Sequence, residues 1–99
     1  MNDPNPLSRS SYPRIAPLYR FQWEAAQNAY VLLFPEGMVQ LNVAAGEILR
    51  RCDGKQSVKQ IIAELRIAFE SDAIDADVEA FLRAATSDGW VEWRDGVTP

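Results

Sequence analysis

The sequence contains no histidine and a single cysteine, Cys52. The commonest general base and metal ligand of enzymes is therefore missing. One thiol cannot form a cysteine-rich zinc site, a redox pair or an internal disulfide. Cys52 lies on the apolar stripe of a predicted helix, so we interpret it as a small core residue rather than a nucleophile. These absences predict a protein that is not an enzyme and that holds no metal and no cofactor.

Glycine is also scarce, and no apolar run is long. The five glycines are isolated from one another, so the sequence has no glycine-rich phosphate-binding loop. No apolar stretch approaches the roughly 20 residues that cross a bilayer. The N-terminus lacks the basic segment and apolar run of a signal peptide. Together with the single cysteine, these features predict a cytoplasmic protein that makes no use of a membrane.

Basic residues are fewer than acidic ones: the sequence has ten Lys and Arg residues and fourteen Asp and Glu residues, for a net charge of -4. Within the third predicted helix, residues 75–88, Arg83 is the only basic residue among four acidic ones. A helix that enters the major groove gains affinity from phosphate contacts, whereas this helix would be repelled. We therefore expect no nucleic-acid partner. Acidic residues at the start of a helix are accounted for by the helix dipole.

Proline is concentrated near the N-terminus, where four of the six prolines lie within residues 1–17. Proline fixes its own φ angle and biases the residue before it away from the helical region. We therefore predict an extended or mobile arm over residues 1–17, one folded domain over 18–94 and a flexible tail over 95–99. A chain of 99 residues is large enough for one compact core and too small for two.

Three consecutive segments after the arm have the patterns of β-strands. Aromatic and polar residues alternate over 19–24, as in a strand with one buried face. The nearly continuous apolar run 29–34 predicts a more buried strand. Gly37 follows Pro35-Glu36 and could close a three-residue hairpin in the left-handed conformation. The segment Met38 to Leu41 would then return as the third strand of a meander.

From Asn42 onward the apolar spacing becomes helical. Asn42 is a suitable N-cap for a first helix that ends at Gly54. The sequence from Ser57 to Gln60 fits a capping box for a second helix. A third helix follows over 75–88, and residues 90–93 could add a short strand. Strands followed by helices predict an α+β domain, a winged helix-turn-helix-like fold with a three-stranded antiparallel meander followed by three helices.

With catalysis and nucleic acid set aside, the pattern favours peptide recognition. A meander has open edges whose main-chain groups are unpaired. An extended peptide could pair with Met38 to Leu41, while the third helix beside that edge supplies apolar side chains such as Val78, Phe81 and Ala85. The competing interpretation is that these three side chains fill the core.

The order and spacing of several segments resemble those of the pyrroloquinoline quinone biosynthesis protein D family. The likeness covers roughly residues 13 to 93, nearly the whole predicted domain. The segments that carry it are Pro13 to Pro17, Tyr19 to Glu24, Val31 to Asn42, Gly46 to Leu49, Arg51 to Gly54, Asp77-Val78, Phe81-Leu82 and Gly89-Trp90.

The resemblance implies a non-catalytic peptide chaperone that recognises the leader of a ribosomally made precursor peptide. Such proteins present the precursor to a radical S-adenosylmethionine (SAM) enzyme, which cross-links a glutamate and a tyrosine. The peptide pairs with the third strand and lies against the third helix. Carried over to this sequence, the peptide-binding residues are Met38, Val39, Gln40, Leu41, Val78, Phe81, Leu82 and Ala85.

Two other functions remain open from the sequence. Open strand edges and a proline-rich arm also suit a structural domain that self-associates as a homodimer. The pair of helices would further allow an acidic helix-turn-helix regulator, although its charge opposes contact with phosphates.

Overall fold

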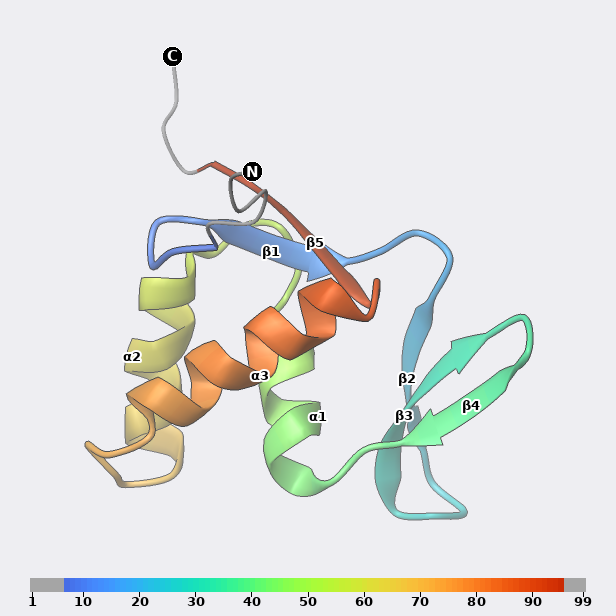
Figure 1. Ribbon diagram of the computed structural model, residues 1–99. Helices are drawn as coiled ribbons and strands as arrows, with labels where there is room; N and C mark the ends of the chain where they lie inside the picture. Colours follow the sequence, from blue (N-terminus) through green and yellow to red (C-terminus); the bar gives the residue numbers. More distant parts are fainter. Residues whose placement is uncertain (1–6, 96–99) are drawn as a thin grey trace.

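The computed structural model describes residues 7–95, which form two small antiparallel sheets beside three helices (Figure 1). The predicted α+β class and winged helix-turn-helix-like arrangement are confirmed. The elements are β1 (Tyr12–Ile15), β2 (Arg20–Glu24), β3 (Ala29–Phe34), β4 (Gly37–Gln40), α1 (Val43–Leu49), α2 (Val58–Ala68), α3 (Asp75–Ser87) and β5 (Val91–Arg94).

Strand β3 is the middle strand of the meander, whose order is β2-β3-β4. Its run of apolar residues suits this position, and Val31 and Leu32 are both fully buried. Leu32 belongs to the main core, which also contains apolar residues of all three helices. Fully burying a side chain of this size contributes about 1.5–3 kcal/mol. The sheet is therefore held to the helices through one face of its central strand.

The turn between β3 and β4 is one residue shorter than predicted. Phe34 pairs with Gly37, so only Pro35 and Glu36 form the loop. Gly37 continues the ladder instead of closing the turn. It is not left-handed, because the positive-φ glycines of the described chain are Gly54 and Gly89. The three-residue hairpin with a left-handed Gly37 is therefore wrong. The extra ladder pair extends the edge strand toward the turn.

The alternating segment at β2 is a strand, but its predicted buried face is only partly covered. Phe21 is half-buried and stacks on Tyr30, with 4.7 Å between the ring centroids. Trp23, two residues later on the same face, is 50% exposed. The helices thus cover the part of the sheet near β3 and leave the end of β2 open to solvent.

Helix α1 begins as predicted and ends earlier than predicted. The side-chain oxygen of Asn42 accepts a hydrogen bond from the Ala45 amide at 2.7 Å, which caps the helix. The helix ends at Leu49, and Gly54 lies in the following loop with φ of 79°. The Gly54 amide donates to the carbonyl of Pro13 at 2.9 Å. Gly54 therefore joins the loop to β1 and does not cap α1.

The predicted boundary at residue 18 is wrong, because much of the supposed arm belongs to the fold. Strand β1 pairs with β5, and Leu7 and Ser11 are buried. The carbonyls of Arg9 and Ser11 accept hydrogen bonds from the first two amides of α2, each at 2.9 Å. Those amides have no acceptor inside their own helix, so the N-terminal segment satisfies them. Residues 1–6 of the predicted arm and 96–99 of the predicted tail lie outside the described residues.

The second and third helices follow their sequence signals closely. The Ser57 hydroxyl accepts from the Gln60 amide at 3.1 Å, and the Gln60 side chain accepts from the Ser57 amide at 2.8 Å, so the predicted capping box is formed. Helix α3 starts at the predicted Asp75. Ion pairs of Asp75 with Arg66 and Arg9 connect its first turn to α2 and to the N-terminal segment.

We predict that Gly46→Ala destabilises the fold by about 1–3 kcal/mol. A Cβ at position 46 would lie 2.8 Å from a Tyr30 ring carbon and 3.3 Å from the Tyr30 Cβ, so α1 or β3 would have to move. The higher helix propensity of alanine, worth up to about 1 kcal/mol, opposes this cost without cancelling it. Urea unfolding measures the change. The matched control is Gly37→Ala, whose Cβ would meet Phe34 at an ordinary 3.8 Å; an equal effect of both substitutions would contradict the prediction.

Candidate functional site

Strand β4 is an edge of the meander, and within residues 7–95 no other strand pairs with its outer row of main-chain groups. The Leu41 amide donates to the Tyr30 carbonyl at 2.9 Å, which fixes the orientation of the backbone at this end. In an antiparallel pair, successive residues direct their main-chain groups alternately toward and away from the partner strand. Gly37, Val39 and Leu41 therefore face β3, whereas the N–H and C=O groups of Met38 and Gln40 point away from it.

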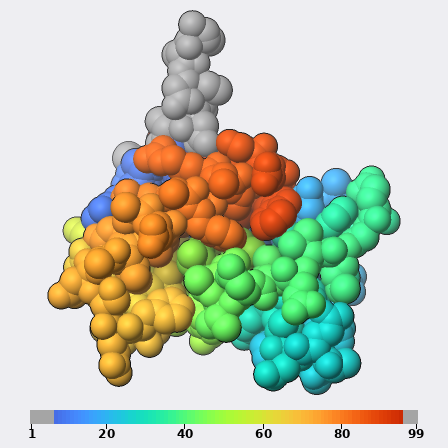
Figure 2. Space-filling view, turned by 60° about the horizontal axis from the view of Figure 1, so that its bottom comes forward, coloured from blue at the N-terminus to red at the C-terminus, as the bar shows by residue number. Residues whose placement is uncertain are grey.

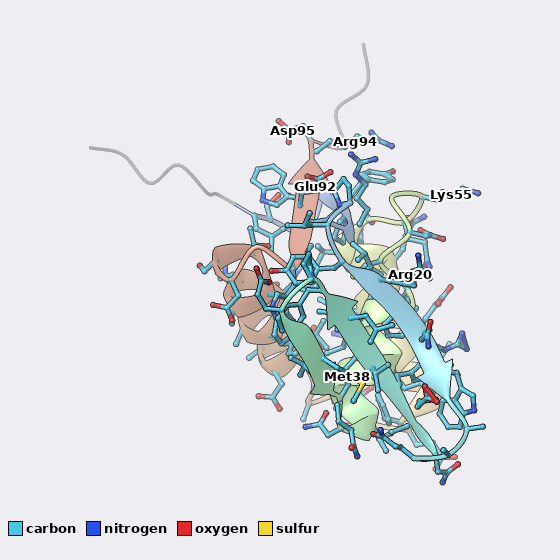
Figure 3. All side chains as sticks on the ribbon, turned by 90° about the vertical axis from the view of Figure 1, so that its right-hand side faces the viewer. Arg20, Met38, Lys55, Glu92, Arg94 and Asp95 are labelled. Carbon is cyan, nitrogen blue, oxygen red and sulfur yellow. The ribbon has the colours of Figure 1, made fainter. Side chains whose placement is uncertain are left out.

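The side chains of β4 divide between the two faces of the sheet. Leu41 is buried in the core, and Val39 packs against the core from a half-buried position. Met38, 46% exposed, lies on the opposite face with the exposed Gln40. In Figure 3, Met38 and Arg20 lie on the side of the sheet that is turned away from the helices. An added strand would therefore meet main-chain groups of Met38 and Gln40, and the side chain of Leu41 is not available to it.

The four predicted residues of α3 have different environments. Val78, Leu82 and Ala85 are only 3%, 0% and 2% exposed, because the helix turns them into the core. Their predicted role as lining of an open groove is wrong for Leu82 and Ala85, which fill the core. Phe81 is half-buried and reaches the surface. Phe81 is thus the predicted α3 residue best placed to contact a ligand.

An apolar hollow of about 350 Å³ opens between the three helices. It lies on the face seen in Figure 2, where α1 (green) adjoins the α2–α3 segment (yellow to orange). The sequence pattern assigned Phe81 and Val78 to a site but none of the other lining residues, because the spacing of one helix does not show which side meets its neighbours. The lining residues are Asn42, Ala44, Ala45, Ile48, Leu65, Phe69, Ile74, Asp77, Val78 and Phe81.

The electrostatics of α3 differ between its two sides. On one side, Arg9 of the N-terminal segment pairs with Asp75 and Glu79, and Arg66 of α2 pairs with Asp75. The pKa of Asp75 lies below its ordinary value because Arg66 donates hydrogen bonds to both carboxylate oxygens. Toward the hollow, Asp77 is exposed. The side of α3 that faces the hollow is therefore acidic.

The single thiol has no features of a reactive group. Burial, together with the smaller effect of the nearby Asp53 charge, raises the pKa of Cys52 to about 12. Its Sγ donates to the Ile48 carbonyl at 3.4 Å inside the helical core. The thiol is therefore neutral near pH 7, and the thiolate is the nucleophilic form.

Among residues 7–95, no three side chains of the metal-ligating types gather closely enough to hold an ion. The helices of this same part of the chain are all too short or too polar to span a membrane.

Together, the fold and the site define an α+β domain of the winged-helix type whose open sheet edge is suited to adding a strand. Residues 29–91 match the family model for coenzyme PQQ synthesis protein D, PqqD, where PQQ is pyrroloquinoline quinone. The chain is 51% identical over 81 residues to the PqqA binding protein of Azotobacter vinelandii, covering 81% of this chain and 88% of that protein. It is 49% identical over 86 residues to the PqqA binding protein of Pseudomonas aeruginosa, covering 86% and 94%.

A solved structure agrees with this result. The solution NMR structure of the PqqD truncation of Methylobacterium extorquens PqqCD matches with a TM-score of 0.67 and 29% identity, covering 81% of this chain and 87% of that chain. That protein is described as a functional, stand-alone recognition element for ribosomally synthesised and post-translationally modified peptides. The chain belongs to the coenzyme PQQ synthesis protein D family, and the family resemblance seen in the sequence is confirmed.

We predict that stability falls as the pH is lowered through the range in which Asp75 titrates. The folded-state pKa of Asp75 is lowered, so its contribution is present above the unfolded pKa and is lost as pH falls through the folded pKa. Between pH 6 and pH 2, the melting temperature measured by thermal unfolding should fall less steeply for Asp75→Asn than for the native chain. Asp72→Asn removes an equal charge from the loop just before α3 but leaves the Arg66–Asp75 pair; equal slopes for both variants would contradict the assignment.

Proposed function

We propose that this chain is a non-catalytic adaptor of pyrroloquinoline quinone biosynthesis that binds the precursor peptide PqqA. The observation that carries this proposal is the open main-chain edge of β4 in a chain 51% identical to a PqqA binding protein. The peptide adds to the meander as a further strand next to β4. The recognition element from Methylobacterium extorquens supports the same class of ligand.

Pairing through the backbone explains how a small surface can hold a flexible peptide. Main-chain hydrogen bonds to Met38 and Gln40 supply affinity, while side chains that alternate along the peptide supply selectivity. Peptide side chains on one face of the added strand meet the half-buried Phe81 of α3. Those on the other face lie beside the exposed Met38. This proposed site keeps Met38, Val39, Gln40 and Phe81 from the predicted set.

The partner that receives the peptide is a radical SAM enzyme. A small carrier that holds the peptide and also contacts the enzyme raises the effective concentration of the peptide at the active site. Support for a purely carrying role comes from the side chains: the sequence has no histidine, and the only thiol has its pKa raised by burial. The peptide's register on β4 would then determine which of its residues reach the enzyme.

We expect Gln40→Pro to weaken PqqA binding at least tenfold and Gln40→Ala to change it less than threefold. Proline removes the outward-facing N–H of residue 40, whereas alanine removes only the side chain. An edge proline leaves the β3–β4 ladder intact, which circular dichroism and thermal unfolding check. Isothermal titration calorimetry with synthetic PqqA measures the affinity of each variant.

Amide mapping of the native chain completes the test. Adding PqqA to ¹⁵N-labelled protein should shift the Met38 and Gln40 amides more than the Phe21 and Trp23 amides, which lie on the opposite edge of the meander. Equal affinities of the proline and alanine variants, or shifts confined to β2, would overturn the β4 site. Concentration-dependent dimerisation without peptide binding would instead favour the self-associating domain.

A further inference from the structure

The helical hollow lies where strand β4 ends. Gln40 is the last residue of β4, and Asn42 and Ala44, just beyond it in sequence, line the hollow. A peptide that runs along the open edge of β4 must leave the sheet either at the Gln40 end or at the Gly37 end. At the Gln40 end it meets the first turn of α1. The hollow is therefore directly accessible to a peptide that extends past the edge strand.

We propose that the hollow between α1, α2 and α3 is a second contact site for the precursor peptide, and that it takes an apolar side chain of the peptide beside a basic one. This inference rests on the proposed function and extends it. The strand-pairing site at β4 holds the peptide by its backbone. The hollow reads a side chain outside the paired segment.

The apolar part of the preference follows from the lining. Apart from Asn42 and Asp77, the hollow is walled by apolar side chains of the three helices. Phe69 on its wall is 38% exposed, and Val43 in the adjacent first turn of α1 is 74% exposed. An apolar side chain placed there removes both its own apolar surface and that of the lining from water, which favours binding. At about 350 Å³ the hollow is at the lower end of the range for ligand pockets, roughly 300 to 1,000 Å³.

The basic part of the preference follows from charge. Asp77 is the only charged residue that the described chain contributes to the lining, and it is exposed. Asp88 lies three turns farther along α3 on the same side, since 77, 81, 84 and 88 repeat at helical spacing. The same side carries no Lys or Arg at these positions. A cationic residue next to the apolar one is therefore attracted to this side of α3, and an acidic one is repelled.

The path of the peptide follows from strand geometry. An antiparallel peptide on β4 has its N-terminal side at the Gln40 end, and a parallel peptide has its C-terminal side there. Extended chain advances about 3.3 Å per residue, so only a few residues separate the last paired position from the first turn of α1. The contacting side chain is therefore close in sequence to the paired segment, on the N-terminal side of it if pairing is antiparallel.

The decisive variant fills the hollow without touching β4. Ala44 lines the hollow from an exposed position on α1, so Ala44→Phe occupies part of the space while leaving the core unchanged. Ala63→Phe is the matched control, because Ala63 is exposed on α2 and is not part of the lining. We expect Ala44→Phe to weaken binding of full-length synthetic PqqA at least fivefold in calorimetry, and Ala63→Phe to leave it within twofold.

An alanine scan of the peptide identifies the occupant. At one apolar peptide residue outside the segment that pairs with β4, replacement by alanine should weaken binding to the native protein. The same replacement should not weaken binding to the Ala44→Phe variant. Such non-additivity marks a direct contact. If no peptide residue couples to position 44, the inference is overturned.

The charge is tested separately with Asp77→Asn. We expect a roughly two- to fivefold loss of affinity at low salt that disappears at high salt, as for an exposed ion pair. Asp95→Asn is the matched control, since Asp95 lies at the end of the molecule opposite Met38 (Figure 3). Equal effects of the two variants would contradict the proposed contact between Asp77 and a basic side chain of the peptide.

The outcomes also separate the two sites. If Gln40→Pro weakens binding and Ala44→Phe does not, the hollow is overturned and the β4 site stands. If Ala44→Phe alters only self-association in light scattering, or only capture of the radical SAM enzyme, the occupant is a second copy or the enzyme, and the inference is overturned. If native protein does not bind PqqA, both the proposed function and the inference fail.

Discussion

The position of the open sheet edge depends on the close approach of helix α1 to strand β3 at Gly46. A side chain at this position would collide with the Tyr30 ring at 2.8 Å. Because glycine has no Cβ, the helix can lie against the strand, and the Asn42 cap then fixes where the helix begins. The direction of the chain between β4 and α1 follows from these two contacts. The orientation of Met38 and Gln40 at the edge follows from the pairing of β4 with β3, which the Leu41 amide continues by donating to the Tyr30 carbonyl.

Around this junction, polar contacts hold the helices in register with one another. The N-terminal segment supplies acceptors to the first amides of α2, and the Arg9, Arg66 and Asp75 side chains connect it and α2 to the first turn of α3. Exposed ion pairs contribute little stability individually. Their role here is geometric, because they orient the side of α3 that carries Phe81 and Asp77 toward the hollow. The proposed contact surface is therefore assembled by segments that do not themselves touch the peptide.

The proposed mode of action uses main-chain groups and packing in place of reactive side chains. A backbone edge can pair with many sequences, so selectivity must come from side-chain contacts beside it. The exposed side chains of β4 beside the edge and the hollow beyond Gln40, which Phe81 helps to line, provide two such contacts at different positions along one peptide. A carrier built in this way can hold a substrate firmly enough to fix its register while leaving the reacting residues free for an enzyme.

Local signals in the sequence predicted where the helices begin, although they failed at the Gly37 turn and at the end of α1. The capping box from Ser57 to Gln60 and the Asn42 cap depend on residues within one helical turn, and both predictions are confirmed, as is the start of α3 at Asp75. The apolar run of β3 likewise predicts its strand. Errors arose where a residue's partner is distant in sequence, as for β1, which pairs with β5 across the whole domain.

The sequence by itself determined the class of fold, the order of the meander and helices, the lack of histidine and the family resemblance. Only the tertiary structure decided that Leu82 and Ala85 fill the core while Phe81 reaches the surface, and that residues of α1, α2 and α3 enclose an apolar hollow. The physical reason is that periodicity identifies the apolar side of a helix, whereas the partner of each apolar residue depends on how helices pack on one another and on the sheet.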